Sequence, residues 1–115
     1  MKKKITALVM AAAMCLSFAA CGSDNGGDTA KDTYTVGICQ LVQHQALDAA
    51  TQGFKDALKE ELGDKVEFVE QNAANDIPTC GTICNGFVSD GVDLILANAT
   101  PALQAATAAT QSIPI

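Results

Sequence analysis

The 115-residue sequence contains no arginine and a single histidine, and only 4% of its residues are aromatic. All thirteen acidic residues follow Cys21, where only four lysines oppose them, so this part of the chain carries a net charge of −9. Binding to a phosphate backbone requires several Lys or Arg contacts. The composition therefore argues against nucleic acid as a partner.

The side-chain combinations typical of catalysis and metal binding are also missing from the sequence. No second histidine exists and no carboxylate lies at ligand spacing from His44, which disfavours acid–base chemistry and metal binding there. Gly37 stands alone, so there is no phosphate-binding glycine loop. A zinc site needs four ligands, and Cys39, Cys80 and Cys84 do not supply them. We therefore expect no enzyme, no metal and no cofactor.

The N-terminal segment has the layout of an export signal. Three lysines precede an apolar run over residues 5–20, which ends in two small residues before Cys21. The run is short for a permanent membrane span, so cleavage before Cys21 and a diacylglycerol on its thiol are expected. We interpret residues 1–20 as a lipoprotein signal peptide. An ordinary signal peptide or a retained anchor is the alternative, and Phe18 stands where leucine is usual.

The next segment, residues 21–33, has almost no apolar side chain and is rich in Gly, Asp and Thr. Such a composition cannot bury enough surface to fold, so it predicts a flexible tether. Two acyl chains on Cys21 are enough for stable anchoring. We expect a domain that begins near Tyr34 and is held by lipid on the extracytoplasmic face of the cell membrane.

Residues 34–115 alternate between strand and helix patterns. Three apolar, β-rich runs, at residues 34–41, 66–71 and 92–98, predict strands that are buried on both faces. Helical spacing of apolar residues between these runs predicts crossover helices. The order predicts an α/β fold with a doubly wound parallel sheet and right-handed crossovers.

Glycine, threonine and proline mark the expected helix ends. The first helix should stop at Gly63 and the second at Gly91, because glycine adopts the conformations that end helices. The third should open at Thr100, which is a good N-cap residue and is followed by a proline. Residues 113–115 look like the start of a fourth strand. Since three strands would leave an open edge, we expect the N-terminal portion of a longer protein.

The second predicted helix contains unusual residues. Gly81 and Gly86 each cost about 1 kcal/mol relative to alanine, so this helix should be soft. Pro78 is tolerable in a first turn capped by Asp76 or just before a cap at residue 79. Cys80 and Cys84 fall on its apolar stripe and are interpreted as core residues. A disulfide is possible outside the cell but awkward between successive turns of one helix.

Ligands of open parallel sheets bind beyond the carboxyl ends of the strands. Thr100 is the strongest candidate, because a helix N-terminus offers backbone N–H groups and a positive dipole end to a ligand carboxylate. The alternative is that Thr100 only caps its helix, and Asp76 has the same alternative. His44 either lines the cleft or is a loop residue that is solvated or hydrogen-bonded to a neighbour. The candidates at the three strand ends are Gln40, Val42, Gln43, His44, Asn72, Asn75, Asp76, Asn98, Ala99 and Thr100.

Three segments carry a resemblance to a known family: TVGICQLVQHQALDAATQGFKDAL, VEFVEQNAANDIPT and, most specifically, FVSDGVDLILANATPALQAA at residues 87–106. Together with the signal and tether, they resemble the extracytoplasmic substrate-binding lipoproteins of ABC importers, in the group associated with tryptophan and other aromatic or hydrophobic amino acids. The resemblance implies a type I periplasmic binding protein, with two Rossmann-like lobes that close on a ligand.

By this resemblance, residues 34–115 supply the N-terminal part of lobe one. The implied function is capture of a small amino-acid-like ligand for import, with the ABC permease subunits as membrane partners. The alternative is an extracytoplasmic sensing domain that presents the same fold to a membrane signalling protein.

Overall fold

The computed structural model describes residues 31–115; the predicted signal peptide, Cys21 and most of the predicted tether lie outside the described residues. Three parallel strands form one sheet: β1 (Tyr34–Gln40), β2 (Val66–Asn72) and β3 (Leu94–Asn98). The strand order is β2-β1-β3, so β1 lies in the centre. The positions of the predicted strands are confirmed, although β3 begins two residues later than the apolar run indicates. The prediction of burial on both faces is wrong for β2, which lies at an edge of the described sheet and buries only Val66.

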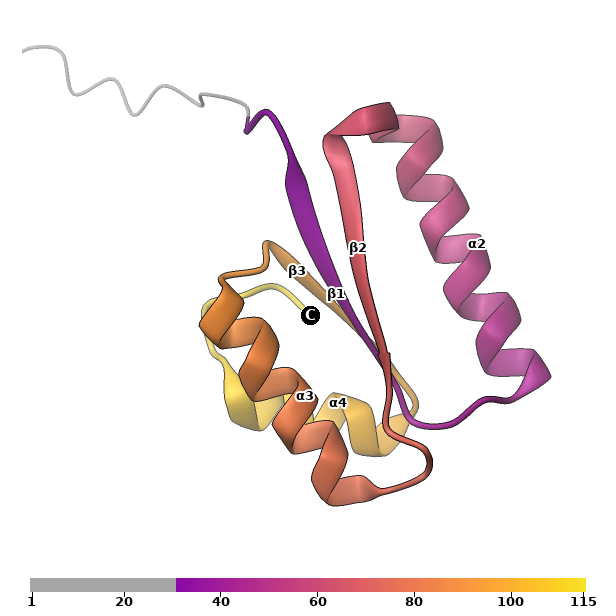
Figure 1. Cartoon of the computed structure of the whole chain (residues 1–115), viewed down its shortest axis with the longest axis vertical. Coiled ribbons are helices and arrows are strands. Elements are labelled where there is room, and N and C mark those ends of the chain that lie inside the picture. The colour runs from indigo at the N-terminus through magenta and orange to yellow at the C-terminus, as the bar shows by residue number, and fades with distance from the viewer. Residues whose placement is uncertain (1–30) are drawn as a thin grey trace, which may run out of the picture. The chain divides into compact units, whose positions relative to one another are not determined.

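Helices cover both faces of this sheet. Figure 1 shows α2 (Gln45–Leu62) on one side, and α3 (Ile77–Asp90) and α4 (Thr100–Ala109) on the other. A short 3₁₀ turn over Gly63–Lys65 leads from α2 into β2. The predicted doubly wound α/β fold is therefore confirmed. Within residues 31–115, no helix is both long enough and apolar enough to cross a membrane.

All three predicted helix boundaries are confirmed, and α4 begins at Thr100 as expected. The helix α2 stops before Gly63, whose φ of 57° is accessible to glycine, and α3 stops before Gly91 in the left-handed conformation. Asp76 caps α3, since its Oδ2 accepts a 3.0 Å hydrogen bond from the Thr79 N–H. Pro78 then lies in the first turn, where its missing N–H costs nothing.

The predicted cap at Thr100 is wrong. A single residue, Ala99, joins β3 to α4, and its carbonyl already accepts the first helical bond, from the Leu103 N–H at 3.0 Å. Thr100 is therefore the first residue inside the helix, and α4 has no side-chain cap. The connection is too short for Thr100 to adopt the extended conformation that a capping side chain requires.

The predicted fourth strand at residues 113–115 is also not formed. One backbone hydrogen bond joins this segment to the edge of β3, from the Ile95 N–H to the Pro114 carbonyl at 2.9 Å. A ladder requires consecutive bonds of this kind. The segment thus lies beside β3 without continuing the sheet.

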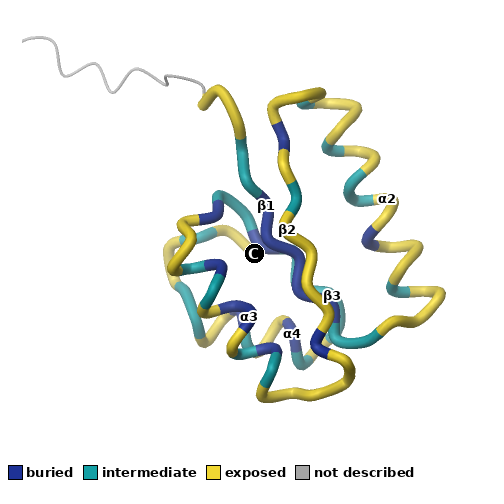
Figure 2. Tube along the Cα trace, viewed as in Figure 1, coloured by how far each residue is buried: buried dark blue, intermediate teal, exposed yellow. Residues whose placement is uncertain are grey.

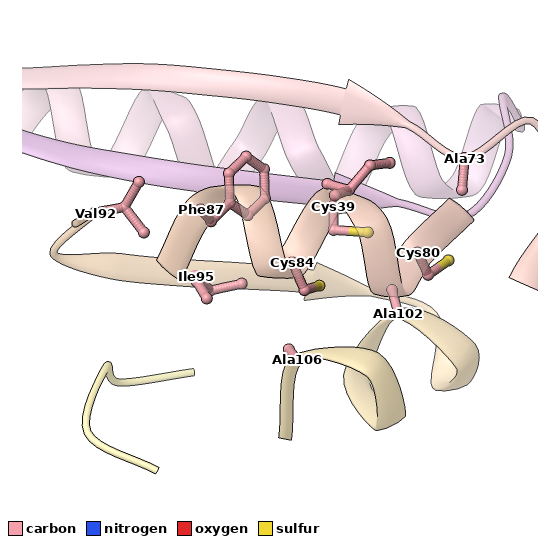
Figure 3. Close-up of a cluster of buried hydrophobic side chains, with 10 residues drawn as sticks. Cys39, Ala73, Cys80, Cys84, Phe87, Val92, Ile95, Ala102 and Ala106 are labelled. Carbon is pink, nitrogen blue, oxygen red and sulfur yellow. The ribbon is translucent and has the colours of Figure 1, made fainter. Parts of the chain in front are cut away.

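Each face of β1 packs against its own helices. Val36 and Ile38 face α2, where Phe54 and Leu58 pack against them. Cys39 faces the opposite way, into a second cluster with Phe87 of α3 and the buried alanines of α4 (Figure 3). Figure 2 shows the resulting concentration of buried residues along β1. Because both faces of β1 are buried, its sequence is an almost continuous apolar run.

Phe87 is the largest fully buried side chain, and it packs directly on the backbone of Gly37. A Cβ atom at position 37 would lie 2.7 Å from atoms of the Phe87 ring. Real side chains do not tolerate such a contact, so glycine is required here for α3 to approach the central strand. This contact therefore sets the distance between α3 and the sheet.

Asp93 joins β3 to β1 at the amino end of the sheet. Its carboxylate accepts a 2.9 Å hydrogen bond from the Thr35 N–H and forms an ion pair with Lys31, while its own N–H donates to the Thr35 carbonyl at 2.8 Å. Lys31 and the Thr35 N–H both hold the pKa of the Asp93 carboxyl below its usual range, because they stabilise the ionised form. These bonds extend the β1–β3 pairing beyond β3 itself.

We expect Gly37→Ala to lower the free energy of unfolding by about 1–3 kcal/mol, because the added methyl group overpacks the contact with Phe87. The matched control is Gly86→Ala on α3, where a Cβ atom meets nothing within 4 Å. That substitution should raise the free energy of unfolding by about 0.5–1 kcal/mol. Urea denaturation measures both, and a neutral Gly37→Ala would contradict the contact.

Candidate functional site

The carboxyl ends of the three strands meet in register at one edge of the sheet. Gln40, the last residue of β1, is aligned with Asn72 at the end of β2 and with Asn98 at the end of β3. Three amide side chains therefore stand in one row across the end of the sheet. This is the edge at which open α/β sheets bind their ligands.

The Gln40 amide is directed into the protein. Only 3% of this residue is exposed. Its Nε2 donates to the Val42 carbonyl at 2.9 Å and to Asp48 Oδ1 at 2.6 Å, and its Oε1 accepts a 2.8 Å hydrogen bond from the Thr51 hydroxyl. Gln40 thus holds the turn after β1 and the start of α2 against the sheet.

Asn98 belongs to the same network. Its Nδ2 donates to the Leu47 carbonyl and to Thr51 Oγ1, both at 2.9 Å. Thr51, which is 3% exposed, therefore donates to one amide and accepts from the other. The sequence reasoning missed Thr51. The available signal was its place on the apolar stripe of α2, between Leu47 and Phe54, where a polar residue needs a buried partner.

The loop after β2 is organised by its own polar side chains. Asn72 Oδ1 accepts a 2.7 Å hydrogen bond from the Ala74 N–H, and Ala74 and Asn75 both have left-handed φ values. The Asn75 N–H donates to the Leu41 carbonyl at 2.8 Å, which ties the loop to the segment after β1. Asn72, Asn75 and Asp76 are exposed at this edge, and the Asp76 carboxylate is used as the cap of α3.

His44 is the N-cap of α2. Its backbone is extended, and its Nδ1 accepts a 3.2 Å hydrogen bond from the Ala46 N–H. The ring is exposed, as is neighbouring Gln43, and Val42 is half-buried. The bond to the Ala46 N–H fits the predicted alternative of a loop histidine that is hydrogen-bonded to a neighbour. Its use as a helix cap was not expected, because histidine is not a preferred N-cap residue.

The start of α4 differs from the other two helix starts. No side chain caps it, Ala99 has a φ of 101° and a ψ of 156°, and Thr100 is exposed. This backbone region is essentially restricted to glycine, and residues held in it cluster at ligand-binding sites. The N-terminal amides and the positive dipole end of α4 therefore face the carboxyl edge without a side-chain acceptor.

Other parts of the described chain offer weaker sites. An open cavity of about 430 Å³, lined by Lys59, Gly63, Asp64 and Val66, lies at the amino end of β2, opposite the edge described above. Among residues 31–115, no group of three or more His, Cys, Asp or Glu side chains is arranged to hold a metal ion. The carboxyl edge with the start of α4 is thus the candidate site.

Residues 35–115 match the family described as ABC transporter substrate binding protein. The chain belongs to the family of ABC transporter substrate-binding proteins. Over 98% of its length it is 42% identical to a tyrosine-binding protein of Clostridioides difficile strain R20291, and it spans 36% of that relative.

Solved structures of similar proteins share this fold. A ligand-free, open substrate-binding protein with adhesive properties from Clostridium difficile aligns with a TM-score of 0.68 at 46% identity, over 71% of this chain and 29% of that one. An ABC domain from Streptococcus pneumonia in complex with L-Trp aligns with a TM-score of 0.67 at 34% identity, over 71% of this chain and 28% of that one. The chain therefore spans about a third of the length of the relatives it matches.

We expect Thr51→Val to lower the free energy of unfolding by about 1–3 kcal/mol, since the buried Gln40 amide and the half-buried Asn98 amide would each lose a hydrogen-bond partner. Thr51→Ser is the matched control. It keeps the hydroxyl and removes one methyl group, which should cost about 0.8 kcal/mol. Urea denaturation measures both variants. Equal losses in the two would mean that the methyl packing, and not the hydroxyl, matters at this position.

Proposed function

We propose that the full-length protein captures an aromatic amino acid outside the cell and delivers it to an ABC permease for import. The supporting observation is the 42% identity, across nearly the whole chain, to a protein named for binding tyrosine. The similarity to an ABC domain in complex with L-Trp points to the same ligand class. The proposed activity is binding and release, with no chemical step on the ligand.

In this proposal, residues 34–115 form the N-terminal part of lobe one, and the ligand lies beyond the carboxyl ends of β1, β2 and β3. The start of α4 receives the ligand carboxylate. Backbone N–H groups at a helix N-terminus and the dipole of the helix favour an anion there. The Thr100 hydroxyl is exposed beside these groups and adds one donor.

The other predicted ligand-binding residues fall into two groups: those whose side chains are hydrogen-bonded within the domain, and those that are exposed at the edge of the sheet. Gln40 and Asn98 use their amides within the domain, so in this proposal they act by holding the strand ends rather than by direct contact. His44, Asn72 and Asp76 are exposed at the edge and line the cleft rim. Val42 and Ala99 contribute backbone groups beside them.

The ligand class is tested by titration calorimetry of the full-length protein with tyrosine, tryptophan, phenylalanine and leucine. We expect tight binding of at least one aromatic amino acid and weaker binding of leucine. Tighter binding of leucine than of all three aromatic amino acids would contradict the proposed ligand class.

The carboxylate site is tested by Thr100→Ala in the full-length protein. Loss of a donor to a charged group should weaken binding by roughly 1.5–3 kcal/mol. Because Thr100 does not cap α4, the melting temperature should hardly change. Thr100→Ser keeps the hydroxyl and should bind like the wild type. An unchanged dissociation constant in Thr100→Ala would move the carboxylate site to the turns after β1 and β2.

We also propose that the mature protein begins at a lipidated Cys21, which holds it on the extracytoplasmic face of the cell membrane. Support comes from the lysines, apolar run and small residues before Cys21, and from the family, whose members work outside the cytoplasm. Cys21→Ser should release the protein into the medium or leave it unprocessed. Mass spectrometry of the wild-type N-terminus checks this, and an unmodified N-terminus at another residue would contradict it.

A further inference from the structure

Three cysteines share one buried cluster in the described chain. Cys39 of β1 and Cys80 and Cys84 of α3 are each 0% exposed, and all three are free thiols (Figure 3). They pack with Phe87 and the alanines of α4 in the layer on one face of the sheet. None of them takes part in the carboxyl-edge network or in the proposed ligand site.

The contact between Phe87 and Gly37 fixes how α3 lies along β1, and therefore which thiols meet. The helix of a parallel crossover runs opposite to its strands. Stepping from Gly37 to Cys39 advances about 6.6 Å along β1 on the same face. Along the axis of α3, toward its N-terminus, Cys84 lies about 4.5 Å and Cys80 about 10.5 Å from Phe87. Since the helix is antiparallel to β1, this is the same direction as the step from Gly37 to Cys39. Cys39 thus lies between the two helix thiols and nearer to Cys84.

The same geometry decides which pair can be bridged. On one helix, Cβ atoms four residues apart are about 5–6 Å from each other, whereas a disulfide needs about 3.5–4.5 Å, so Cys80 and Cys84 do not suit each other. Cys39 is better placed, because the missing Cβ of Gly37 lets α3 approach β1 closely. The Cα atoms of the two elements come within 8 Å.

The electrostatics agree with this proximity. Burial raises the pKa of the Cys39 thiol far above its usual range, and the neighbouring Cys84 and Cys80 raise it further. Burial likewise raises the pKa of Cys84. The thiolate is the reactive species, so the folded, closed domain reacts slowly. Reaction therefore proceeds as the domain folds or when α3 opens from the sheet.

We propose that Cys39 and Cys84 form a redox-sensitive pair, which a small-molecule disulfide converts into a covalent bridge between the central strand and α3. One cysteine, as thiolate, attacks the small disulfide, forms a mixed disulfide and releases one small thiolate. The other cysteine, deprotonated in turn, attacks the protein sulfur of the mixed disulfide and releases the second. The two cysteines lose two protons and two electrons, and the small disulfide is reduced to two thiols.

The bridge stabilises the layer that carries the candidate site. It closes a loop that contains α2, β2 and about the first half of α3, and closing this loop restricts the conformations of the unfolded chain. Because disulfides persist in oxidising compartments and open in reducing ones, the stability of the domain follows the redox conditions outside the cell. Cys80 is the neighbouring thiol that remains free.

The test refolds the full-length protein from denaturant in mixtures of oxidised and reduced glutathione, blocks free thiols and maps the bridged peptides by mass spectrometry. Peptide mapping separates this cluster from Cys21 and from Cys15, which lies in the apolar run of the predicted signal peptide. We expect a Cys39–Cys84 bridge in the wild type and in Cys80→Ala. The oxidised protein should melt about 5 °C or more above the reduced one, and a reductant should reverse the shift.

Variants without one partner give the controls. Cys39→Ala should leave Cys80 and Cys84 both free under the same conditions. The proposal is overturned if the wild type keeps Cys39 and Cys84 free at every glutathione ratio, or if Cys80 and Cys84 bridge each other. If Cys39→Ala fails to fold, the Cys80→Ala variant provides the test, since Cys39 and Cys84 are then the two cysteines that remain in the cluster. A Cys39–Cys84 bridge in this variant supports the proposal, and free thiols at every glutathione ratio overturn it.

Discussion

The close approach of α3 to the central strand is the constraint on which the rest of the described fold depends. Gly37 has no side chain, so the Phe87 ring rests on the β1 backbone itself. This contact sets the depth of the layer that contains α3 and α4, which is filled by small residues, three cysteines and several alanines. A larger residue at position 37 would lift α3 and open space that these small side chains cannot fill.

The opposite face of the sheet is held by a different kind of interaction. There, α2 packs with larger apolar side chains, and the polar residues Gln40, Thr51 and Asn98 meet where the strands end. No buried polar side-chain atom in the described chain lacks a hydrogen-bond partner. Because the network joins both β1 and β3 to α2, it fixes the strand ends at the candidate site without occupying the exposed edge.

The sequence predicted the strands, the order of elements and the stops at Gly63 and Gly91, because each rests on a local pattern or on the conformational freedom of glycine. The direction of the Gln40 and Asn98 amides was missed, although period-two alternation places Gln40 on the same face as Ile38. The cap at Thr100 failed because it depends on the length of the β3–α4 connection, which no local propensity encodes.

Two kinds of group lie at the carboxyl edge of the sheet: amide side chains that are bonded within the domain, and the uncapped start of α4. The buried Gln40 amide must have partners inside the domain, and both it and the half-buried Asn98 amide have them. The start of α4 has the reverse arrangement: an uncapped helix end, approached through Ala99 in a backbone region that costs about 1–3 kcal/mol. A rigid strand end on one side and a helix on the other hold that conformation in place. An edge built this way is ordered by the fold and leaves the start of α4 without a side-chain cap, and such preorganisation lowers the entropic cost of binding in the site that we propose.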